Sequence, residues 1–246
     1  MTSNMTSNLT SRTMFFRLVI VLAALGASAC SYGSAVDVAP MKDRVAHPIV
    51  PPGDYCQAHG AQGAYIISTH DDCGKLTWNG AKRRLDVIDE DKPKDDKPKD
   101  AKPKDAMSLA VVALGGGLFV TQYEAADPAD RPDKHQLNLV IASGKAFAAV
   151  GVLDGDELGV ILKRHPNLKI GGPAGKDNYI AAGDVEEIKA FLREAGGASL
   201  KAAKLKGEEV EVVVLDKRSR AEHPASAAQV KDIEAVKAIA ETLTPK

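Results

Sequence analysis

The sequence predicts an α+β fold: an antiparallel β meander, as a sheet or a partly closed barrel, with about three helices that are mostly C-terminal. Short apolar runs separated by turn residues occupy the middle of the chain, and apolar residues at helical spacing follow in its last third. Strands first and helices afterwards are typical of the α+β class. The 246 residues suffice for one large domain or two small ones.

The first strands are predicted between residues 54 and 90. They span Gly63 to Thr69, Gly74 to Trp78, and Arg84 to Asp89. Asn79-Gly80 is a strong signal for a tight turn, so the second and third runs should form a hairpin. Cys56 and Cys73 are 17 positions apart. A disulfide between them would stabilise this unit by about 3 kcal/mol in the chain-entropy model.

A five-residue repeat follows, running from Asp91 to Asp105 with the pattern Asp-Lys-Pro-Lys-Asp and one Ala variant. It offers no apolar side chain for burial and carries a proline in every copy, so we expect residues 91–106 to be a disordered loop insertion. A spacer, or an electrostatic contact to peptidoglycan or an anionic surface, is the alternative. Six Lys against five Asp leave little net charge for such a contact.

Two further hairpins and three helices are predicted after the insertion. The hairpins join Leu109–Leu114 to Leu118–Tyr123 and Leu137–Ala142 to Ala146–Leu153, and the helices span Asp156–Arg164, Asp184–Ala195 and Ser226–Leu243. Asp184 with Glu187, and Ser226 with Gln229, have the spacing of capping boxes, and Gly196-Gly197 should end the second helix. Val210–Leu215 is expected to be a strand buried on both faces.

The amino-terminal residues have the pattern of an export signal. Arg12 and Arg17 precede an apolar run from Leu18 to Leu25, and the small residues Ala27-Ser28-Ala29 precede Cys30. The run is far shorter than the roughly 20 residues of a membrane-spanning helix. Met1, Met5 and Met14 are alternative starts of this leader.

Ala27-Ser28-Ala29-Cys30 resembles the lipobox of bacterial lipoproteins. The resemblance implies cleavage before Cys30, acylation of its thiol and amino group, and, with Ser31 following, a place on the periplasmic face of the outer membrane. Three cysteines fit this interpretation, because one is left over if Cys56 and Cys73 pair. Cleavage by an ordinary signal peptidase, giving a soluble periplasmic or secreted protein, remains the alternative.

These features divide the chain into a signal peptide (1–29), a flexible tether (30–53) and an α+β domain (54–246). The 32 basic and 33 acidic residues leave no basic excess for phosphates, so nucleic acid is not an expected partner. Aromatic residues are scarce, which argues against a carbohydrate-stacking surface.

No catalytic, metal or cofactor site is predicted. Ser68, His70, Asp71 and Asp72 gather within five residues, but such close neighbours are poorly aimed for proton transfer. The glycine-rich run 171–176 has Asp177 where a phosphate-binding loop needs Ser or Thr, and Ser143 belongs to a hairpin turn. The histidines lack the spacing of metal ligands. Asp154 to Glu157 lacks the ligand order of a calcium loop.

We therefore expect an exported, lipid-anchored protein of the cell envelope whose domain binds or scaffolds and does not catalyse. Its partners would be the membrane, through the lipid, and an envelope protein or peptidoglycan. A periplasmic hydrolase or transferase centred on His70 is one alternative. A carrier of a small apolar ligand inside a β-barrel is the other.

Overall fold

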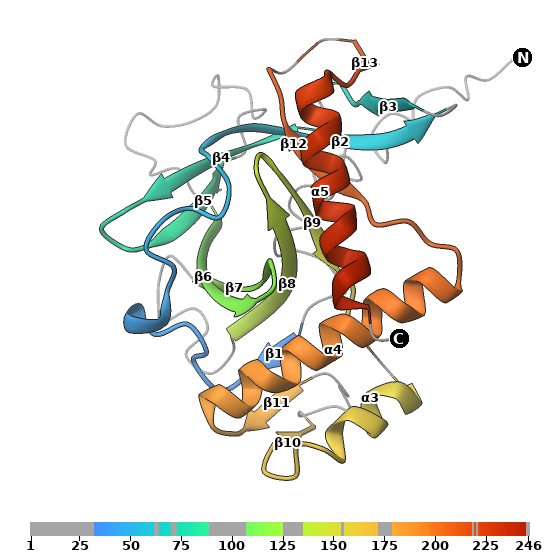
Figure 1. Cartoon of the computed structure of the whole chain (residues 1–246). Coiled ribbons are helices and arrows are strands. Elements are labelled where there is room, and N and C mark those ends of the chain that lie inside the picture. Colours follow the sequence, from blue (N-terminus) through green and yellow to red (C-terminus); the bar gives the residue numbers. More distant parts are fainter. Residues whose placement is uncertain are drawn as a thin grey trace, which may run out of the picture.

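The computed structural model describes residues 32–61, 64–69, 73–88, 107–124, 135–153, 155–171, 179–217, 219 and 221–244. It confirms the α+β class: an antiparallel barrel of eight strands closes on itself, and α-helices that are mostly C-terminal cover one side (Figure 1). In pairing order the barrel strands are β8 (His135–Ser143), β7 (Leu118–Glu124), β6 (Met107–Gly115), β5 (Arg84–Ile88), β4 (Cys73–Asn79), β2 (Gly53–Ala61), β12 (Val212–Leu215) and β9 (Ala146–Val150), which pairs with β8 again.

The three predicted hairpins are confirmed. In β4–β5 the side chains of Trp78 and Leu85 lie opposite each other, and β6–β7 and β8–β9 turn at their glycines. The barrel closes through β12, a strand distant in sequence, which pairs with β2 on one edge and with β9 on the other. Val212, Val213 and Val214 are all buried, so the predicted burial of this strand on both faces is confirmed.

In the part of the chain that the structure describes, five short strands lie outside the ring. β1 (Tyr32–Ser34) pairs antiparallel with β8 and parallel with β11 (Tyr179–Ala182), which β10 (Lys169–Ile170) borders. β3 (Ala64–Ile67) pairs with β2 and with β13 (His223–Pro224). Most of these strands are too short for an alternating pattern to reveal them in the sequence.

The described residues form the α-helices α3 (Gly155–Leu162), α4 (Val185–Leu205) and α5 (Ala227–Leu243), and a 3₁₀ helix at Met41–Asp43. Ser226 and Gln229 make the predicted capping box of α5. The expected end of α4 at Gly196-Gly197 is wrong, because the helix continues to Leu205. A Cβ at Gly196 would lie 3.2 Å from Leu139 and 3.3 Å from Leu118, so this glycine lets the helix approach the barrel closely.

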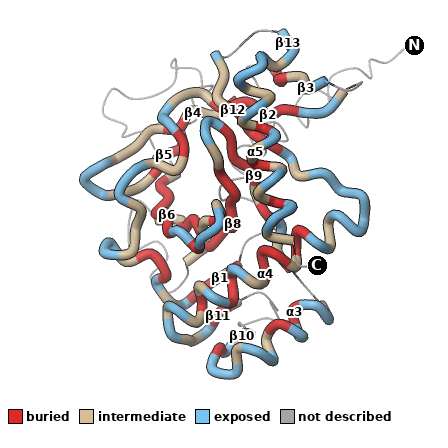
Figure 2. Tube along the Cα trace, in the orientation of Figure 1, coloured by how far each residue is buried: buried red, intermediate tan, exposed pale blue. Residues whose placement is uncertain are grey.

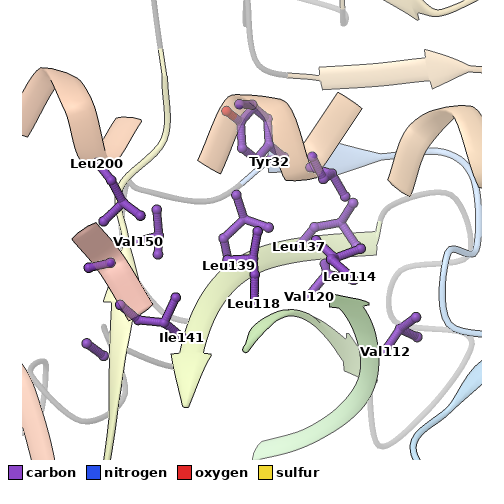
Figure 3. Close-up of a cluster of buried hydrophobic side chains, with 14 of the residues drawn as sticks. Tyr32, Val112, Leu114, Leu118, Val120, Leu137, Leu139, Ile141, Val150 and Leu200 are labelled. Atoms are coloured by element: carbon purple, nitrogen blue, oxygen red, sulfur yellow. The ribbon is translucent and has the colours of Figure 1, made fainter. Parts of the chain in front are cut away.

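Apolar side chains pack in two layers. One layer lies between the outer face of the barrel and the helices, and Figure 3 shows Leu118, Leu137 and Leu139 of the strands in it with Tyr32 and Leu200. The second layer fills the inside of the barrel. In Figure 2 the helices are buried where they face the strands and exposed on the other side.

The expectation of a flexible tether over residues 30–53 is wrong from Tyr32 onward. Tyr32, Val38, Ala39 and Val50 are buried, and the amide of Val38 donates a hydrogen bond of 2.9 Å to Oε1 of Gln122 on β7. The segment shows no periodicity because each apolar residue enters a different place in the fold. Cys30, Ser31 and the insertion at 91–106 lie outside the described residues.

Candidate functional site

The inside of the barrel is filled at its centre. An eight-stranded barrel is just wide enough either to be packed by its own side chains or to hold one small ligand. Tyr55, Val111, Val140 and Phe147 point inward and are 0–1% exposed. The rings of Tyr55 and Phe147 are 5.3 Å apart between centroids. Because a cavity that admits water would leave accessible area on these side chains, their packing favours a solid core.

One end of the barrel is closed by the segment 45–52. The amide of Val45 donates to the carbonyl of Val111 over 3.0 Å, and the side chain of Val50 packs into the inner apolar layer. Tyr55 donates its phenolic hydrogen to the carbonyl of Pro51 over 2.8 Å. Burial raises the pKa of Tyr55 far above its ordinary value, so this phenol stays a neutral donor. We call this the closed end.

The opposite end receives polar side chains from β7 and β8. Thr121 and Asn138 lie directly opposite each other in the strand register, on the inner face and buried. By the alternation along a strand, Tyr123 and Gln136 share this face one step further out, and both are partly exposed. We call Thr121, Tyr123, Gln136 and Asn138 the polar end. A hydroxyl, a phenol and two amides can donate and accept hydrogen bonds.

A charged network on the outer face has a structural role. Arg44 pairs with Glu124, and its guanidinium also donates to the carbonyls of Ala39 and Lys82, each over 2.9 Å. Arg84 joins Glu124 at 3.3 Å and Asp86 at 2.9 Å. These contacts hold the amino-terminal segment on β5 and β7. Since each arginine faces a carboxylate, the network is balanced in charge.

An aspartate–histidine pair lies where β12 ends. Nε2 of His223 is 3.5 Å from Oδ1 of Asp216, and Nδ1 of the same ring is 3.4 Å from the carbonyl of Ala221. Gln229 donates to Asp216 over 2.8 Å. Both ring nitrogens of His223 therefore face hydrogen-bond acceptors. A histidine that acts as a general base needs one ring nitrogen beside the hydroxyl or thiol that it activates, and this arrangement does not supply that contact. Because Gln229 belongs to α5 and Asp216 follows β12, these contacts hold the start of α5 against the barrel.

A second histidine cluster joins α4 to the turn after α3. Nε2 of His165 is 3.1 Å from Oε2 of Glu194, and Arg164 pairs with the same carboxylate. The hydrogen bond from Arg164 lowers the pKa of Glu194 below its ordinary value, and the bond from His165 adds to the effect. The imidazole also meets the ring of Phe191 edge-on. These contacts hold α4 against the turn after α3, so the cluster has a structural role.

The structure brings together Cys56 and Cys73, as predicted. They are directly opposite each other in the register of β2 and β4, with a Cα–Cα distance of 4.1 Å, and form a disulfide. The bridge joins two barrel strands and borders the outer apolar layer.

Several other sequence candidates lie outside the described residues: Cys30, His70, Asp71, Asp72, Asp154 and the run 172–177. Ser68 is described; it is buried, and its amide donates to the carbonyl of Gln57 over 2.9 Å. Ser143 ends β8 at the hairpin turn, as expected. Across the described ranges, no three His, Cys, Asp or Glu side chains gather as a metal site would require.

The polar end was not predicted, because each of its side chains is an ordinary residue of a strand. Only the register of β7 and β8 brings Thr121 to Asn138. Within the described part of the chain, no helix is both long and apolar enough to span a membrane. Comparison of the chain with protein-family models, with curated proteins and with solved structures finds no match.

Proposed function

We propose that the chain is an exported protein of the cell envelope, cleaved before Cys30 and held on the membrane by lipid at this cysteine. Its barrel domain binds an envelope protein or peptidoglycan and catalyses no reaction. Recognition uses the polar end of the barrel, where Tyr123 and Gln136 are partly exposed. The observation that carries the proposal is the contrast between this end and the packed apolar centre behind it.

Three features support export. The leader ends in small residues at Cys30. β1, Tyr32–Ser34, comes after the expected cleavage point, so the domain keeps this strand when the leader is removed. A disulfide such as Cys56–Cys73 persists chiefly in oxidising compartments.

Mass spectrometry of the protein from its native envelope tests export and lipid attachment. The expected amino-terminal peptide begins at Cys30 and carries acyl chains, and the Cys30→Ser variant should lack them. A full-length chain with its leader, or an unmodified Cys30, would contradict the lipid anchor.

Cross-linking in intact envelopes tests recognition at the polar end. Tyr123→Phe should weaken the cross-link to the partner, because it removes a partly exposed hydroxyl that can donate and accept. Lys201→Ala on α4, an exposed residue far along the chain from β8, is the matched control and should cross-link as the parent does. Equal cross-linking of both variants and the parent would exclude this end as the binding surface.

The carrier and enzyme alternatives have separate tests. The packing of Tyr55 and Phe147 disfavours a carrier, and an apolar fluorescent probe should therefore gain no emission when it is mixed with the protein. For the enzyme alternative, His70→Ala would abolish any hydrolase or transferase turnover, while His59→Ala, on an exposed position of β2, would not. Turnover that disappears only with His70→Ala would replace our proposal.

A further inference from the structure

We draw no further inference here: the strongest candidate, the surface patch at the end of α4 where lysines flank the exposed side chain of Leu205, is offset in charge by Glu208, Glu209 and Glu211 directly after it, and nothing in the described part of the chain shows what covers it.

Discussion

Replacing Gly144 with alanine should lower the free energy of unfolding by about 1.5–3.5 kcal/mol. Gly144 forms the turn between β8 and β9 with φ at +57°, a conformation that costs a residue with a Cβ about 1–2 kcal/mol. The new Cβ would also lie 2.2 Å from Oδ1 and 3.1 Å from Cγ of Asp232 on α5. Asp232 must then turn away. It is half-buried and Oδ1 is the end of its side chain, so this displacement adds about 0.5–1.5 kcal/mol.

Gly207→Ala is the matched control for the backbone cost. Gly207 follows α4 with φ at +73°, and no atom lies within 4 Å of the Cβ that alanine would add. Gly207→Ala should therefore lower the free energy of unfolding by about 1–2 kcal/mol, which is the backbone cost alone. Urea unfolding followed by circular dichroism measures both variants, provided the slopes stay equal.

A double-mutant cycle of Gly144→Ala with Asp232→Ala isolates the collision, because Asp232→Ala leaves room for the new methyl group. The coupling energy should be about 0.5–1.5 kcal/mol. A coupling near zero, or equal losses for the two glycine variants, would refute the packing of α5 on this hairpin.

Four further predictions concern single contacts. The double variant Cys56→Ala/Cys73→Ala should have a free energy of unfolding in urea about 3 kcal/mol below that of the parent, because the bridge closes a loop of 17 positions. If the difference between variant and parent persists after a reductant is added to both, the bridge is not its cause. Val50→Ala should lower the free energy of unfolding by about 2 kcal/mol, because it removes two buried methyl groups at the closed end. If Val50 belonged to a flexible tether, the substitution would leave the free energy of unfolding unchanged. Ser226→Ala should lose about 1 kcal/mol with the α5 cap, and Ser219→Ala, which caps no helix, should lose much less. The pKa of Glu194 is lower in the folded protein, so its ionised form stabilises the fold above the unfolded pKa and this stability is lost as the pH falls through the folded pKa. The loss caused by Glu194→Gln should therefore be present at neutral pH and shrink below about pH 4, and a difference constant with pH would exclude the ion pair as its cause.

Local signals explain why the hairpins could be predicted. Asn79-Gly80, the glycines at 115–117 and Gly144 each mark a turn within the strands that they join. The closure could not be predicted in the same way. Val212–Leu215 pairs with strands that precede it by more than 60 and more than 150 residues, and no local pattern selects these partners.

The amino-terminal segment escaped prediction for a related reason. Val38, Ala39 and Val50 fill separate sites, so they produce neither a helical nor an alternating pattern. The disulfide could be predicted, because two of three cysteines remain once Cys30 is assigned to the leader. The polar end could not, since Thr121 and Asn138 meet only through the register of two strands.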